Sequence, residues 1–98
     1  MVFTCTVPAK PTVQVDDDRV RITRWDFEPG ATTGWHEHAM PYCVVMVLGG
    51  TLVVHDGVKE TSVTLAAGDA YVRPKGITHD VKNGSDHPLA FVEVEMKG

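Results

Sequence analysis

The feature that most constrains the fold is a series of short β-type segments separated by turn residues. Runs rich in Val, Thr, Ile and aromatic residues predict strands over 12–15, 19–28, 33–38, 41–48, 51–55, 62–65, 70–73, 78–82 and 89–96. Among the turn sequences between them, Asp56-Gly57 and Asn83-Gly84 are typical of tight hairpins. No stretch has the period of a long amphipathic helix. The pattern therefore predicts an all-β sandwich or barrel.

Length, charge and composition limit the domain count and the classes of partner. The 98 residues suit one core, so we expect a single domain over residues 1–98. A net charge of −4 argues against a nucleic-acid surface, and no apolar run approaches the ~20 residues that span a bilayer. Residues 1–6 lack the pattern of a signal peptide. We therefore expect a cytoplasmic protein in which Cys5 and Cys43 are reduced thiols.

Two strands carry explicit predictions about which face is buried. Segment 41–48 is apolar on both faces, with Tyr42, Val44, Met46 and Leu48 on one side and Cys43, Val45 and Val47 on the other. Because a second subunit would cover the outer face, we expect a homodimer, in which residues 2–7 could pair with the partner's sheet. In the last segment we expect the core face to be Ala90, Val92, Val94 and Met96, opposite Phe91, Glu93 and Glu95.

Three histidines from two places in the chain are the candidate metal ligands. His36 and His38 are one residue apart and would point to the same face of a strand. His79 follows the turn 74–76, which would direct the next strand inward. Imidazoles converging from two strands suit Zn, Cu, Fe or Ni, and three protein ligands leave coordination positions open for a substrate. We therefore expect one divalent transition metal per chain.

The spacing of these histidines resembles that of the cupin family. The first cupin motif is matched over 30–49 by Gly30, His36, His38, Tyr42 and Gly49. The second is matched over 68–83 by Gly68, Pro74, Gly76, His79 and Asn83. The resemblance implies a small single-domain cupin, a jelly-roll β-barrel that holds a divalent metal. We also expect a short strand segment at 1–11 ahead of the two motifs. Similar small cupins are often of unassigned function, and some are encoded beside genes of amino-acid or amine catabolism.

The chain departs from the family pattern at Tyr42, where a cupin usually has a fourth ligand, Glu. The change leaves a three-histidine set, which resembles that of thiol and diketone dioxygenases and so favours iron, with Mn, Ni, Zn and Cu as alternatives. Tyr42 could ligate as a phenolate, donate a hydrogen bond to a bound molecule or fill space; an ordinary pKa near 10 makes the phenolate the weakest of the three. The expected pocket lining is Met40, Val44, Met46 and Val81.

These observations leave three functions open. The first is a three-histidine, non-haem Fe(II) dioxygenase or related oxidoreductase acting on a small molecule, with Tyr42 as a candidate catalytic residue. The second is a non-catalytic cupin that binds or senses a small ligand. The third is a metal-assisted lyase or isomerase, which needs a base; only Glu93 is a candidate, and only if the last strand presents its other face inward.

The other polar residues are expected to be structural or solvated. Glu37 should face away from the histidines, and His55 and His87 should be exposed rather than ligating. Arg73 and Lys75 flank the turn of the second motif, where they could hold a substrate carboxylate, although solvated charges are the simpler interpretation.

Overall fold

The computed structural model describes residues 7–98, and all its regular elements are strands. The nine strands are β1 (Lys10–Asp16), β2 (Val20–Phe27), β3 (His36–Glu37), β4 (Tyr42–Leu48), β5 (Gly50–His55), β6 (Glu60–Leu65), β7 (Ala70–Arg73), β8 (Thr78–Asn83) and β9 (Leu89–Met96). They match the expected segments closely, except that the predicted strand 33–38 shortens to two residues. No helix that could cross a membrane is found within residues 7–98.

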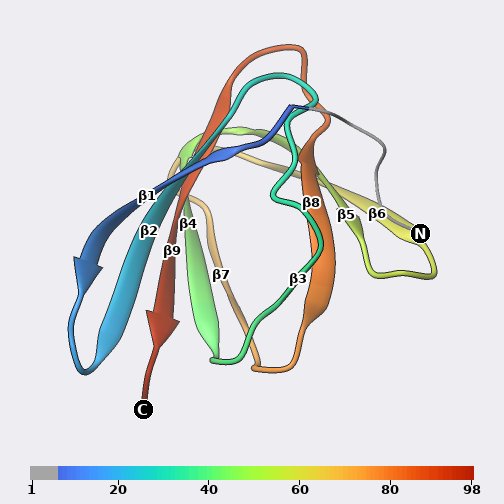
Figure 1. Ribbon diagram of the computed structural model, residues 1–98. Coiled ribbons are helices and arrows are strands. Elements are labelled where there is room, and N and C mark those ends of the chain that lie inside the picture. Colours follow the sequence, from blue (N-terminus) through green and yellow to red (C-terminus); the bar gives the residue numbers. More distant parts are fainter. Residues whose placement is uncertain (1–6) are drawn as a thin grey trace.

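The strands form two antiparallel sheets that face each other (Figure 1). One sheet has the order β1-β2-β9-β4-β7 and the other β3-β8-β5-β6. Neighbours in each sheet are often distant in sequence, because the chain crosses from one sheet to the other, as in a jelly roll. The expected all-β jelly-roll fold is therefore confirmed.

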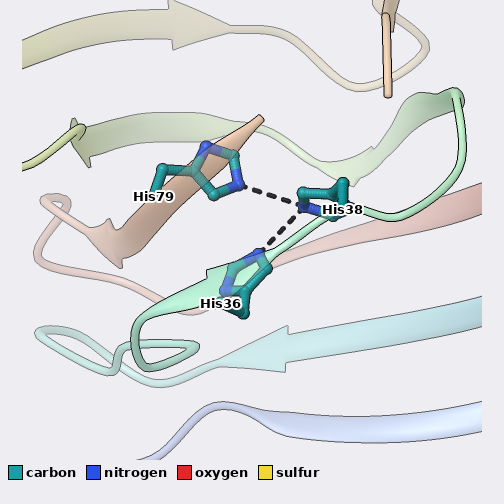
Figure 2. Close-up of side chains that lie close together, drawn as sticks. All are labelled: His36, His38 and His79. Carbon is teal, nitrogen blue, oxygen red and sulfur yellow. Dashed lines mark hydrogen bonds between the residues drawn. The ribbon is translucent and has the colours of Figure 1, made fainter. Parts of the chain in front are cut away.

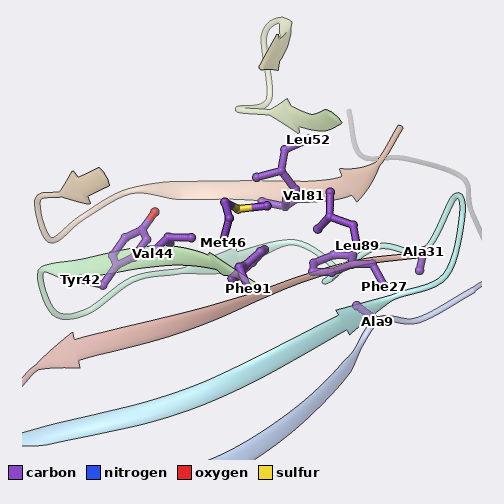
Figure 3. Packing of buried hydrophobic residues seen from close by; sticks show 10 residues of the cluster. All are labelled: Ala9, Phe27, Ala31, Tyr42, Val44, Met46, Leu52, Val81, Leu89 and Phe91. Carbon is purple, nitrogen blue, oxygen red and sulfur yellow. The ribbon is translucent and has the colours of Figure 1, made fainter. Parts of the chain in front are cut away.

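The apolar core fills the space between the two sheets (Figure 3). Phe27, Met46 and Leu89 come from the five-stranded sheet, and Leu52 comes from the other; each is at most 2% exposed. The rings of Phe27 and Phe91 pack at 5.3 Å between centroids. Since alternate residues of a strand point to opposite faces, these side chains determine which face of each strand is turned inward.

Of the predicted core face of β9, Ala90 is buried, but the assignment of the face is wrong because Phe91 and Glu93 face the interior. β9 lies between β2 and β4, with Met46 opposite Phe91 and Val44 opposite Glu93. Paired residues in an antiparallel sheet share a face, so both join the buried side of β4. Phe91 is 4% and Glu93 9% exposed, whereas Val92 remains partly exposed on the outer side. The larger aromatic ring at position 91 fills the core, and this places an acidic residue inside.

β4 has one buried and one exposed face. Its inner residues Tyr42, Val44 and Met46 are at most 2% exposed, while Val45 and Val47 are 38% and 36% exposed on the other side. Leu48 was expected on the inner side but is 46% exposed, because the register with β9 shifts between Met46 and Leu48. The apolar outer face thus exists in the single chain, and the homodimer expected to cover it remains a prediction. Residues 2–6, which were expected to take part in it, lie outside the described residues.

Asn83 does not form the expected hairpin, because β8 and β9 belong to different sheets. Its side chain is instead buried, at 1% exposed. The amide nitrogen donates hydrogen bonds to the carbonyl oxygens of Phe27 and His87, and the amide oxygen accepts one from the Ser85 N–H. Asn83 therefore ties the connection between the sheets to the end of β2.

Candidate metal centre

The three expected histidines lie together inside one end of the sandwich (Figure 2). β3 pairs with β8 so that His36 is directly opposite His79. His38 follows β3, and its backbone N–H and carbonyl bond to Ile77 and Gly76 of the turn before β8. The Nε2 atom of His38 is 2.9 Å from that of His36 and 3.1 Å from that of His79. Pairing of two distant segments therefore brings three ring nitrogens to one point.

The orientation of His36 is set by a backbone contact. Its Nδ1 lies 2.8 Å from the carbonyl oxygen of Gly34, which can only accept a hydrogen bond. Nδ1 must therefore carry a proton, and in the neutral ring Nε2 presents its lone pair to the other two histidines. A backbone carbonyl that fixes the tautomer in this way is a common partner of a metal-ligating histidine.

The other two histidines are held in the neutral form by their surroundings. Burial, followed by the charge of His36, lowers the pKa of His38 from 6.5 to about 4. Burial, followed by the charges of His36, His38 and Arg73, lowers the pKa of His79 to about 3. Near neutral pH both rings can therefore offer a lone pair to a cation rather than repel it.

The donor set fits a transition metal. With metal–nitrogen bonds of about 2.1 Å and right angles between them, ligand nitrogens are about 3 Å apart, close to the separations found here. Without a cation, three Nε2 atoms this close cannot all present lone pairs favourably. Three protein ligands leave coordination positions open, as in catalytic sites.

Tyr42 lies against the histidine cluster from β4. Its ring stacks on that of His38, with 3.9 Å between centroids and 19° between planes. Burial, followed by the charges of Tyr71 and Glu93, raises the pKa of the Tyr42 phenol to about 12, although Arg73 acts in the opposite direction. The phenol therefore stays protonated near neutral pH, which favours a hydrogen-bond donor or packing role over a phenolate ligand.

Two carboxyl groups, those of Glu93 and Glu95, lie beside the triad. The sequence interpretation considered Glu93 only for the case in which β9 presents its other face inward, and it did not consider Glu95. Glu93 and Glu95 each place a carboxylate oxygen close to a ring nitrogen of His38, with all three ligand atoms within 4.8 Å of one another. Burial, followed by the charge of Glu95, raises the pKa of Glu93 to about 7. Glu95 lies 3.7 Å from the guanidinium of Arg21. The side lacking the family's usual glutamate thus has acidic groups from the neighbouring strand.

A cavity of about 700 Å³ reaches the site from the edge where β6 and β7, which belong to different sheets, do not pair. Its walls include Tyr42, Val54, Asp56, Lys59, Val63, Leu65, Tyr71, Arg73, Ile77 and His79. Met40, Val44, Met46 and Val81, which were expected to line the pocket, are absent from the walls of this cavity. Val44, Met46 and Val81 belong to the apolar core. The cavity lies outside this core, toward β6 and β7.

The remaining predictions concern residues outside the cluster. Glu37 is exposed, as expected from strand alternation, and His87 is exposed in the connection before β9. His55 is partly buried at the end of β5, where its Nδ1 accepts a hydrogen bond from the Gly57 N–H. Cys43 is a free thiol, as predicted, whereas Cys5 lies outside the described residues.

Known proteins resemble this chain both in sequence and in fold. A cupin domain model matches residues 23–95. The beta-alanine degradation protein BauB of Pseudomonas aeruginosa is 46% identical over 89 residues, covering 91% of this chain and 94% of that protein. A crystal structure of a cupin domain from Bordetella pertussis superposes with a TM-score of 0.90 at 43% identity, covering 94% of this chain and 96% of that one.

A more distant structure resembles the chain in fold alone. The polyketide cyclase RemF of Streptomyces resistomycificus has a TM-score of 0.70 and 21% identity, covering 95% of this chain and 70% of that one. The family match spans both histidine segments, and the close relatives cover nearly the whole chain. The protein is therefore a small single-domain member of the cupin family, with a histidine cluster that could bind a metal.

Proposed function

We propose that this cupin is a three-histidine, metal-dependent oxidoreductase, of the non-haem Fe(II) dioxygenase type, acting on a small molecule. The observation that carries the proposal is the convergence of the Nε2 atoms of His36, His38 and His79 at 2.9 and 3.1 Å. The cavity of about 700 Å³ that His79 lines is large enough for a small substrate. The name of the BauB relative favours a small compound from amino-acid catabolism.

Each part of the site has a defined task in this proposal. His36, His38 and His79 would hold the metal, which when bound supplies Lewis-acid chemistry and, as iron, electrons for O2. The protonated phenol of Tyr42 can donate a hydrogen bond to a substrate oxygen or sulfur atom. The apolar walls formed by Val54 and Leu65 would exclude water from part of the cavity.

A second candidate is a metal-assisted lyase or isomerase, favoured by the position of Glu93. Such chemistry requires a base, and Glu93 places a carboxyl group beside His38 with its pKa raised to about 7. A pKa near the working pH suits a group that takes and returns a proton. This candidate uses the same metal and cavity, and it differs from the first in needing no O2.

The first test is the metal content of protein purified without a histidine tag or chelator. We expect close to one metal ion per chain in the native protein and in the His87→Ala control, but loss of metal in His79→Ala with an unchanged circular dichroism spectrum. Retention of full metal occupancy by a folded His79→Ala variant would contradict the site. An unfolded variant would instead show that His79 has a structural role.

The second test separates the two candidate reactions. Metal-loaded protein is incubated with short thiols, diketones and amino-acid-derived carboxylic acids while O2 is followed with an electrode. Substrate-dependent O2 uptake that His79→Ala abolishes would support the oxidoreductase. Conversion without O2 uptake, lost in Glu93→Gln, would favour the lyase or isomerase. Binding without conversion would point to a ligand-binding cupin.

A further inference from the structure

Arg73 is an exposed residue that forms part of the cavity wall, where it places a positive charge near the histidine cluster. It is opposite Tyr42 in the pairing of β4 with β7, so both side chains lie on the inner face of the sheet. Arg73 lines the cavity together with Tyr42 and His79, and its charge affects the pKa values of both. The ion pairs found among residues 7–98 involve other cations, so Arg73 is not neutralised by a carboxylate there.

The rest of the cavity favours an anion with an apolar body. Lys59 adds a second cation from the turn between β5 and β6, whereas Asp56 is the acidic residue of the lining. The Asp56 Oδ1 accepts hydrogen bonds from the N–H groups of Val58 and Lys59. These hydrogen bonds, followed by the charge of Lys59, lower the pKa of Asp56. The charges of Lys59 and Asp56 offset each other, so Arg73 supplies the net positive charge of the lining. Val54, Val63 and Leu65 supply apolar parts of the wall. A ligand with one negative end and a short hydrocarbon chain matches this distribution.

We propose that Arg73 is the substrate-binding residue that anchors the carboxylate of a short-chain carboxylic acid, directing its other end toward His36, His38 and His79. A guanidinium offers two parallel N–H donors that match the two oxygens of a carboxylate. The ligand would be short, because Arg73 is paired directly opposite Tyr42, whose ring stacks on that of His38. The identity of the reacting end rests on the proposed function, whereas the carboxylate contact does not.

The experiment measures propionate binding by isothermal titration calorimetry. We expect Arg73→Gln to weaken propionate binding at least tenfold, and Arg73→Lys to weaken it less, because a lysine keeps the charge but not the paired donors. Lys75→Gln is the matched control, because Lys75 flanks the same turn and is not part of the lining. Propionamide, which has the same shape without the charge, should bind much more weakly than propionate. Thermal unfolding of each variant checks that it is folded.

Four results would overturn the inference: no saturable propionate binding at millimolar concentrations, equal binding by folded Arg73→Gln, equal binding of propionamide, or preference for inorganic phosphate over propionate. The same titrations, combined with the metal content of the native protein, separate this inference from the proposed function. Arg73-dependent propionate binding in a native protein that holds no metal would contradict the metal enzyme and leave the anchor in place. Stoichiometric metal together with propionate binding that does not depend on Arg73 would support the metal site and contradict the anchor.

Discussion

Glu93 is a buried acid whose replacement should stabilise the protein at high pH. Glu93→Gln replaces the carboxyl group by a neutral amide of nearly the same shape. Burial and the charge of Glu95 raise the pKa of Glu93 from 4.5 to about 7, and the residue is only 9% exposed. Because the folded pKa lies above the unfolded value, the folded chain binds the proton more tightly. The stabilising contribution of proton binding at Glu93 is therefore complete below about pH 4.5 and is lost as the pH rises through about 7.

The size of the effect follows from those two values. At about 1.4 kcal/mol per pH unit, the interval from 4.5 to about 7 corresponds to about 3 kcal/mol. We therefore expect Glu93→Gln to have nearly the native free energy of unfolding at about pH 4.5 and to exceed it by about 3 kcal/mol above neutrality. The lowered pKa values of His38 and His79 act in the opposite direction, because the stability they contribute is lost as the pH falls below 6.5. This contribution is the same in the native protein and in Glu93→Gln, so it does not affect the difference between them.

The assay is urea denaturation followed by tryptophan fluorescence, in the presence of a chelator, at a series of pH values. The difference in free energy of unfolding between the variant and the native protein should grow from acidic to neutral pH and then level off. Glu60→Gln, at an exposed position, serves as the control and should show no such difference. A constant difference at every pH, or none at all, would refute the placement of a buried carboxyl group with a raised pKa in the interior.

Three further predictions follow from the packing. Met46→Ala should lower the free energy of unfolding by about 2–5 kcal/mol in urea denaturation, because Met46 is 2% exposed in the core; a smaller loss would contradict that packing. Tyr42→Phe should keep a native metal content by elemental analysis, because its phenol is protonated; loss of metal would make Tyr42 a ligand. Sedimentation should give twice the 10.7 kDa chain mass, and Val45→Asp should give one chain, because Val45 and Val47 form an exposed apolar outer face; a native monomer would exclude the homodimer.

Local sequence signals predicted the strand content because they depend only on nearby residues. Alternating β-branched residues and turn sequences placed eight strands close to their observed bounds. The shortest strand, His36–Glu37, was predicted too long. Its extent depends on its pairing with β8, in which Glu37 lies opposite Thr78, and not on local preference. The four-residue connection 56–59 was recognised as a turn, but Asn83-Gly84 was mistaken for a hairpin because sequence does not show that its two strands lie in different sheets.

The candidate metal ligands were also visible in the sequence. Their spacing in two motifs places His36 and His38 on one segment and His79 on another, and the fold brings the three together. The cavity was not predictable in the same way, because its walls come from strands whose distance apart depends on the packing of both sheets. Residues assigned to the lining, such as Met46, instead filled the core, while Arg73 proved to be part of the wall.

The sequence by itself determined an all-β chain with three converging histidines, because turn chemistry, strand alternation and motif spacing are properties of short segments. Only the tertiary structure decided that Glu93 lies inside. Alternation shows that Phe91 and Glu93 share one face, but not which face is buried. The choice of buried face depends on the pairing of β9 with both β2 and β4. The ring of Phe91 fills the core better than the valines of the other face, and Glu93 is buried as a consequence.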